Sequence, residues 1–340
     1  VDGENGEVIV EPTDKQLEEV EGEDTIEVID DNVETDNGKE VEVAANVANH
    51  EEVEQATKNG ADGIGLYRTE FMFLEREKPP TEEEHLENYV DALNQFPENR
   101  VIVRTMDIGG DKPVPYLDQD ESDNPFLGLR GIRLAFEQGE ELFNTQIKAL
   151  LRATATDNGD NLAVMFPMIS SVEEFEKALN KIKQMEKELE EEEKDYARPE
   201  LGLMVETPSA VQMAGELAEK ADFLSIGTND LTQYTMAASR TDSNVADLQN
   251  PLHPSVLRSI KQTIDSGHEN NAWIGMCGEM AGNPELTALL VGLGLDELSM
   301  ASGVVPSVKS EIKDLESSKA VDKAEMILSM KSLAEIENSI

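Results

Sequence analysis

Eight short runs of apolar and β-branched residues recur along the chain, and each is followed by a stretch with the pattern of an amphipathic helix. The runs begin at Val41, Gly63, Val101, Leu162, Leu201, Phe223, Ala272 and Glu297. Near-continuous apolar strands that alternate with helices are typical of parallel strands covered on both faces. The count of eight favours an α/β fold of the (β/α)8 TIM-barrel type over an open, doubly wound sheet.

This pattern divides the chain into three parts. Residues 41–340 are predicted to form the barrel and its closing C-terminal helices, with two further helices in an insert at 111–160. Residues 13–40 are strongly acidic and are interpreted as a helix and a linker. Residues 1–12, VDGENGEVIVEP, contain a turn and one strand. One strand cannot fold alone, so it is either an ornament on the barrel or the edge of an upstream domain.

The charge of the chain excludes several classes of partner. Its 28 basic and 72 acidic residues give a net charge of -44, which argues against binding to nucleic acid or to anionic membranes. No apolar stretch approaches the roughly 20 residues of a transmembrane helix, and the acidic N-terminus differs from a signal peptide. The single Cys277 cannot form an internal disulfide. We expect a cytoplasmic protein, either from a salt-rich cytoplasm or simply an acidic one.

Arginine side chains gather near the predicted strand ends. The C-terminal ends of barrel strands share one mouth, where active sites form. Four of the ten arginines lie in or just after segments predicted to face this mouth, namely Arg68, Arg104, Arg130 and Arg240. Guanidinium groups bind phosphate and carboxylate in a bidentate manner, so we expect a small, multiply charged anion as the ligand. The alternative is that each arginine pairs with a neighbouring acid.

Two carboxylates and one amide are predicted to face the same mouth. Glu206 and Asp230 follow neighbouring strands and have no His or Cys companions, a donor set that suits Mg²⁺ bound together with substrate oxygens. The alternative is a structural or general acid–base role for these two acids. Asn229 precedes Asp230 and is placed at the same strand end.

Cys277 also lies at a predicted strand end. A lone cysteine usually packs as a small hydrophobic residue. If it is active, nearby acids such as Glu279 would keep the thiol protonated and favour a proton-donor role over a nucleophilic one. The histidines lack the Gly, Ser or Thr context that exposes a nucleophilic imidazole, so we expect structural or solvated roles for His50, His85, His253 and His268.

Eight segments of the chain resemble the C-terminal, phosphoenolpyruvate-binding (PEP-binding) domain of Enzyme I of the bacterial sugar phosphotransferase system, a phosphoenolpyruvate-protein phosphotransferase. They are GIGLYRTEFMF, VIVRTMDIGGDKP, NPFLGLRGIR, VMFPMISSVEE, GLMVETPSA, SIGTNDLTQYT, NPLHPSVL and GMCGEMAG, in family order within residues 41–313. The superfamily includes pyruvate, phosphate dikinase and PEP synthase, but TMDIGGDK and GLYRTEF are more similar to Enzyme I. Residues 1–12 resemble the last strand of that family's swivelling phosphohistidine domain.

The resemblance implies a role for each predicted site residue. PEP would be bound by Arg68, Arg104, Asn229, Asp230 and Arg240, with Arg130 as a further phosphate contact. Glu206 and Asp230 would hold Mg²⁺, and Cys277 would protonate the enolate of the departing pyruvate. The implied partners are a phosphohistidine domain, a small phosphocarrier protein and a second copy of the chain in a homodimer.

The chain departs from the family in its acceptor. The family's phosphoryl acceptor is a histidine in a Gly-Gly-x-x-Ser-His type of segment, and this sequence has no such segment. The chain is therefore interpreted as a fragment, a split subunit that receives the histidine in trans, or a remnant. Around Arg240 the sequence AASRTDS lacks the family's preceding Asp and following Gly. Alternative functions are a dikinase or synthase barrel, a Mg²⁺-dependent lyase of 2-oxo acid enolates, and a non-catalytic PEP-sensing or dimerisation module.

Overall fold

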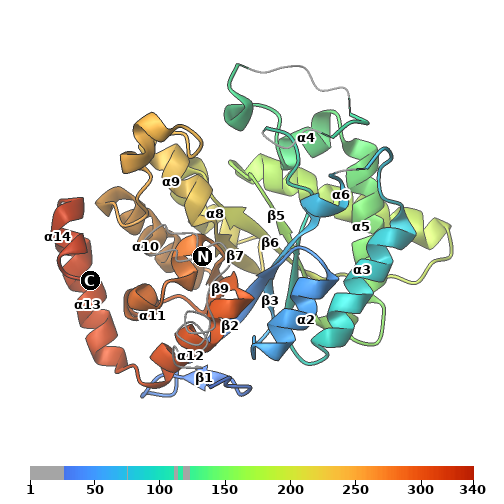
Figure 1. Ribbon diagram of the computed structural model, residues 1–340. Helices are drawn as coiled ribbons and strands as arrows, with labels where there is room; N and C mark the ends of the chain where they lie inside the picture. Colours follow the sequence, from blue (N-terminus) through green and yellow to red (C-terminus); the bar gives the residue numbers. More distant parts are fainter. Residues whose placement is uncertain (1–26, 75, 111–113, 118–122) are drawn as a thin grey trace, which may run out of the picture.

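The computed structural model describes residues 27–340 apart from residue 75 and residues 111–113 and 118–122. Eight parallel strands follow one another around a barrel, which is closed by pairing of its first and last strands (Figure 1). The strands are β2 (Glu40–Val47), β3 (Ile64–Arg68), β4 (Val101–Arg104), β5 (Leu162–Phe166), β6 (Glu200–Val205), β7 (Phe223–Ile226), β8 (Trp273–Met276) and β9 (Glu297–Ala301). The predicted (β/α)8 barrel is confirmed, and each apolar run supplies one strand.

Helices surround the barrel and bury one face each. They are α2 (His50–Lys58), α3 (Glu82–Gln95), α4 (Ile132–Glu137), α5 (Glu140–Thr154), α6 (Val172–Glu191), α7 (Pro208–Gln212), α8 (Ala214–Ala218), α9 (Thr228–Met236), α10 (Pro254–Glu269), α11 (Thr287–Leu293), α12 (Val305–Lys313), α13 (Ser317–Ser329) and α14 (Leu333–Glu337). Helix α6 illustrates why one face is buried, because its apolar residues recur at helical spacing. Its buried residues are Phe175, Ala178, Ile182, Met185 and Leu189. The insert holds α4 and α5, as predicted.

The apolar core has two layers. The larger layer lies between the outer faces of the strands and the helices. A smaller cluster fills part of the barrel interior and comprises Leu66, Ile102, Ala163, Met165, Met204, Phe223 and Cys277. Strands β2 and β9 contribute no side chain to this inner cluster. The barrel interior is therefore apolar along the strands that supply this cluster, whereas β2 and β9 add no side chain to it.

The chain enters the barrel along a short antiparallel strand. Strand β1 (Val33–Glu34) pairs with the start of β2. The fully buried Lys309 donates to the backbone oxygens of Ile29 (3.0 Å) and Asp31 (3.1 Å) and also contacts the Asp62 carboxylate. In the described part of the acidic segment, residues 27–40, the structure contains this strand and no helix. The strand predicted in residues 1–12 lies outside the described residues, as do residues 13–26.

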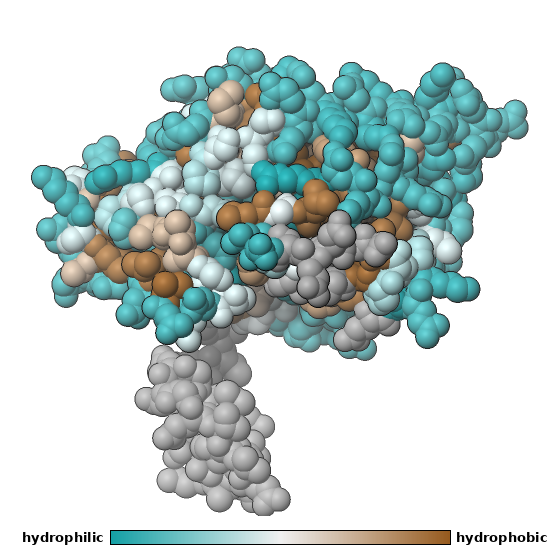
Figure 2. All heavy atoms as spheres, turned by 90° about the horizontal axis from the view of Figure 1, so that it is seen from above, coloured by the Kyte–Doolittle hydropathy of each residue, from teal (hydrophilic) through white to brown (hydrophobic). Residues whose placement is uncertain are grey.

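The exterior is strongly polar. Figure 2 shows a face that is mostly hydrophilic, as the net charge of -44 requires. Within the part of the chain that the structure describes, no helix combines the length and the apolar character needed to cross a membrane.

Candidate active site

A cavity of about 580 Å³ opens at the C-terminal ends of the barrel strands. All eight site residues predicted from the sequence line it: Arg68, Arg104, Arg130, Glu206, Asn229, Asp230, Arg240 and Cys277. Glu70 and Asp107 line it as well. Residues that are far apart in sequence are thus brought to one opening, because the parallel strands all end there.

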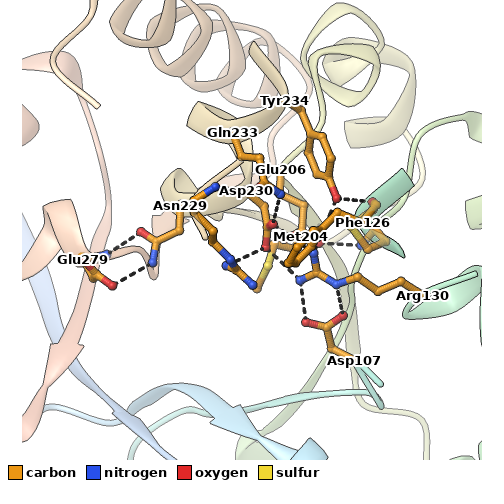
Figure 3. A network of polar contacts seen from close by, with 12 residues as sticks. Asp107, Phe126, Arg130, Met204, Glu206, Asn229, Asp230, Gln233, Tyr234 and Glu279 are labelled. Carbon is orange, nitrogen blue, oxygen red and sulfur yellow. Dashed lines mark hydrogen bonds and ion pairs between the residues drawn. The ribbon is translucent and has the colours of Figure 1, made fainter. Parts of the chain in front are cut away.

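Arg130 is buried at the wall of this cavity and is bound on two sides by carboxylates (Figure 3). Its Nε and Nη2 donate to the two oxygens of Asp107, both at 3.0 Å. Its Nη1 and Nη2 donate to the two oxygens of Asp230 at 2.9 and 2.8 Å, and Nη1 also reaches the Tyr234 hydroxyl at 3.5 Å. Burial opposes the charged form, but Asp107 and Asp230 outweigh it and raise the pKa of Arg130.

This geometry uses the whole guanidinium fork of Arg130. Its five N–H donors point at protein oxygens, which is the alternative considered for each arginine from the sequence. In this arrangement Arg130 orients Asp107 and Asp230, while its role as a phosphate contact stays a prediction.

Arg104 is also buried, at the end of β4. Its Nη2 contacts Glu70 at 2.7 Å and Asp107 at 3.2 Å, and Nη1 lies 3.8 Å from the sulfur of Met204. Burial alone would lower the pKa of Arg104, but the negative charges of Glu70 and then Asp107 outweigh burial and raise that pKa. Its buried Nε has no hydrogen-bond partner among the described residues. One donor of Arg104 is therefore buried without a partner among the described residues.

Arg68 and Arg240 are more exposed than the other two arginines. Arg68 lies 3.5 Å from Glu52 and over the ring of Phe71. Arg240 lies 3.5 Å from the Oδ2 atom of Asp230 and over the ring of Phe126. Both ion pairs are long, and both arginine side chains are partly exposed.

Glu206 and Asp230 place two buried carboxylates close together. The Glu206 Oε1 atom accepts a 2.6 Å bond from the backbone N–H of Met168, whose φ of 58° lies in the left-handed region. Burial and then the charges of Asp230 and Asp107 raise the pKa of Glu206 to about 8. A divalent cation would relieve this repulsion, and the oxygen donors fit Mg²⁺. Among the described residues no group of three or more His, Cys, Asp or Glu could hold a metal.

Asn229 and Cys277 complete the predicted set. The Asn229 amide exchanges two hydrogen bonds with Glu279: Nδ2 donates to its carboxylate at 3.0 Å, and Oδ1 accepts from its backbone N–H at 3.3 Å (Figure 3). Cys277 is only 7% exposed. Burial raises the pKa of its thiol to about 12, although the Ser225 hydroxyl and Arg104 act in the opposite direction. The thiol is therefore protonated at neutral pH, as a proton donor must be.

Three polar contributors were not among the predicted site residues. Glu70 and Asp107 bind the buried arginines, and their position just after strand ends was the available signal. Asn46, at the end of β2, donates to the backbone oxygen of Cys277 at 3.1 Å. The sequence signal for Asn46 was an amide side chain within an otherwise apolar run. None of the four histidines lines the cavity; His85, for example, is buried against Tyr89, and burial lowers its pKa to about 4.

Residues 23–317 match the family described as PEP-utilising enzyme, PEP-binding domain. The chain belongs to this family. Its relatives include proteins named phosphoenolpyruvate-protein phosphotransferase from Haloferax volcanii (48% identical, 99% of this chain), Haemophilus influenzae (43%, 100%) and Listeria monocytogenes (42%, 99%). The chain spans about 60% of the length of each. A citrate lyase from Burkholderia xenovorans, 12% identical over 88% of both chains with a TM-score of 0.52, shares the fold.

The double contact of Arg130 predicts a large effect on stability. Arg130→Ala would remove the guanidinium that makes the two-sided contact with the buried Asp107 and Asp230, and their remaining contacts with Arg104 and Arg240 are longer, so we expect the free energy of unfolding to fall by about 3–5 kcal/mol. Urea unfolding measures this loss. Arg133→Ala is the matched control, because that arginine pairs with the partly exposed Glu174 and should cost at most about 1 kcal/mol. Equal losses in the two variants would contradict the assignment.

Proposed function

We propose that the chain binds PEP with Mg²⁺ at the barrel mouth and transfers the phosphoryl group to a histidine on a separate phosphohistidine domain, with release of pyruvate. The observation that carries this proposal is the convergence of all eight predicted residues on one cavity. The family and the names of the relatives support it.

The chemistry of the mouth suits a small trianion. Arg68, Arg104 and Arg240 offer guanidinium donors, and phosphoryl transfer depends mainly on positioning and on neutralising the charge of the moving group. Mg²⁺, held by Glu206 and Asp230, would supply further neutralisation of the phosphate oxygens. The neutral Cys277 thiol then donates its proton to the methylene carbon of the enolate.

The surroundings of the cavity suit an approaching domain. Phe71, Leu127 and Leu129 are exposed apolar side chains in segments that follow strand ends or flank cavity residues. A partner that covers them would bury apolar surface and exclude water from the transfer step. The homodimer and the small phosphocarrier partner stay predictions of the resemblance.

Calorimetry tests the binding site directly. PEP should bind only when Mg²⁺ is present, and Arg104→Ala or Glu206→Ala should weaken binding at least about tenfold, because a hydrogen bond to a charged group contributes about 1.5–3 kcal/mol. Arg133→Ala, outside the cavity, should bind as the unmodified chain does. An unchanged affinity for PEP in the Arg104 and Glu206 variants would contradict the assignment of this cavity as the PEP site.

Reconstitution tests the transfer. The chain mixed with a separately made phosphohistidine domain, PEP and Mg²⁺ should release pyruvate, whereas a domain with its acceptor histidine replaced by Ala should release none. Absence of pyruvate under all conditions, with PEP binding intact, would favour the sensing module. A gene upstream that encodes an ATP-grasp domain would favour the dikinase or synthase alternative.

We also propose that the chain works in a salt-rich cytoplasm. The acidic groups that give the net charge of -44 repel one another. Salt shortens the Debye length from about 10 Å at 0.1 M to about 3 Å at 1 M and so weakens the repulsion between exposed charges. The thermal midpoint should therefore rise with KCl, mostly below about 1 M. A midpoint that does not change with KCl would contradict the proposal, and an equal concentration of sorbitol controls for solute effects other than screening.

A further inference from the structure

The side-chain amide of Asn46 ties three strands together where the barrel closes. Asn46 lies near the end of β2 and lines the cavity. Its Nδ2 atom donates to the backbone oxygens of Cys277 at 3.1 Å and of Ser299 at 3.3 Å. Its Oδ1 atom accepts a 2.6 Å bond from the Ser299 hydroxyl. One side chain of β2 is thereby bound to β9 and, across β9, to the residue that follows β8.

These contacts determine which way the Asn46 amide faces. The backbone oxygens of Cys277 and Ser299 can only accept, so the group that meets them is the NH2 group, which has two hydrogens to donate. Ser299 is fully buried. Gly65 on β3 makes room for it, because a Cβ at Gly65 would lie 2.4 Å from the Ser299 Oγ atom. Both polar atoms of the amide are therefore bound by the barrel wall.

The Cys277 backbone lies just beyond the regular pairing of β8. Strand β8 ends at Met276, and its described register with β9 ends at the pair of Met276 and Leu298. The N–H group of Cys277 donates to the Ile226 oxygen of β7 at 3.1 Å. On the other side, the Asn46 amide binds the Cys277 carbonyl. Cys277 is thus held from both neighbouring sides, and Asn46 supplies one of the two contacts.

Backbone contacts, more than contacts of the thiol, determine where the sulfur of Cys277 lies. A thiol is a weak hydrogen-bond donor, and the Sγ atom lies 3.9 Å from the Ile226 oxygen. The following residue packs closely against the start of α9, because a Cβ at Gly278 would lie 1.7 Å from the Thr228 Oγ1 atom. The β7 side of this segment is therefore fixed by close packing, and the β9 side by the amide of Asn46.

We propose that Asn46 is a positioning residue for the proton donor, because its amide fixes the Cys277 carbonyl and so aims the thiol at one face of the enolate. The proposal rests on the proposed function. In that step the S–H bond breaks, a C–H bond forms with the enolate electron pair, and the thiolate regains a proton from water. Proton transfer requires the donor within reach of the accepting atom, and a misplacement of about 1 Å can lower a rate about 100-fold.

The stereochemistry of the new methyl group tests this role. PEP with one methylene hydrogen replaced by deuterium is turned over with the phosphohistidine domain in tritiated water, and lactate dehydrogenase traps the pyruvate as lactate. The unmodified chain should give a methyl group of one configuration. Asn46→Ala should lower kcat about tenfold or more with an unchanged KM for PEP, and should lose the excess of one configuration, because water then protonates the released enolate on either face.

Asn161→Ala is the matched control for this experiment. The Asn161 Nδ2 atom also donates to a backbone oxygen, that of Pro97 at 2.7 Å, but Asn161 does not line the cavity. Its kcat and product configuration should equal those of the unmodified chain. Circular dichroism verifies the fold of each variant, and Asn46→Leu, of similar size and without a donor, replaces Asn46→Ala if the latter is unfolded. A folded Asn46 variant with unchanged kcat and configuration would overturn the proposal.

Alkylation without substrate separates this proposal from the proposed function. Cys277 is the single cysteine, so its rate of reaction with iodoacetamide reports how firmly its segment is held. Loss of one hydrogen bond predicts a rate about two- to tenfold higher in the Asn46 variant and no change in Asn161→Ala. Equal rates in all three proteins would contradict the positioning role. If the unmodified chain releases no pyruvate, the proposed function fails, while the alkylation rates still decide whether Asn46 holds Cys277.

Discussion

The double fork between Arg130 and the carboxylates of Asp107 and Asp230 is the contact on which the mouth of the barrel depends. The contact joins Arg130, just before α4, to Asp107, which follows β4, and to Asp230 in the first turn of α9. These segments are distant in sequence. Such a contact is stable in a buried site only because each charge meets an opposite charge at hydrogen-bond distance. It fixes Asp230 beside Glu206, and so it determines where negative charge is concentrated. The buried carboxylates of Glu70, Asp107, Glu206 and Asp230 outnumber the buried guanidinium groups of Arg104 and Arg130. The wall therefore favours additional positive charge, from a metal ion or from the more exposed arginines.

The mouth and the exterior of this protein have opposite electrostatic requirements. A net charge of -44 repels a trianion at long range, while the arginines of the cavity attract it at short range. Salt separates the two effects, because exposed charges more than a Debye length apart are screened and buried pairs are screened much less. A salt-rich solution would thus weaken the long-range repulsion of a small anion and leave its short-range attraction to the cavity arginines largely unchanged. Surface acidity and an anion site are compatible under that condition.

Sequence reasoning reached the fold and the gathering of the eight candidate residues around one cavity, but not the contacts among them. The apolar runs indicate parallel strands covered on both faces, their count of eight favours a barrel, and the mouth follows because strand ends converge. Which acid binds which arginine depends on side-chain reach across the cavity, so the commitment of Arg130 to Asp107 and Asp230 could not be read from spacing. The burial of Glu297 was hidden for a similar reason, since a polar residue at the start of a strand looks solvent-exposed until strand register places its side chain inside the barrel. Residues 13–40 were predicted as a helix and a linker from their acidity. In the described part, residues 27–40, pairing of β1 with β2 and the carbonyl contacts of Lys309 determine the conformation.

The polar lining along β2 and β9 is hard to explain by stability alone. Elsewhere the barrel interior is filled by Ile102, Met165, Met204 and Phe223, which pack without polar groups that need partners. Glu297 instead buries a carboxyl with no partner among the described residues, at a cost of about 1–3 kcal/mol even when neutral. A leucine would fill comparable space without that cost, and Gly65 and Gly275 each give up packing to make room for the acid. Glycines on β3 and β8 thus leave room for one buried carboxyl of β9.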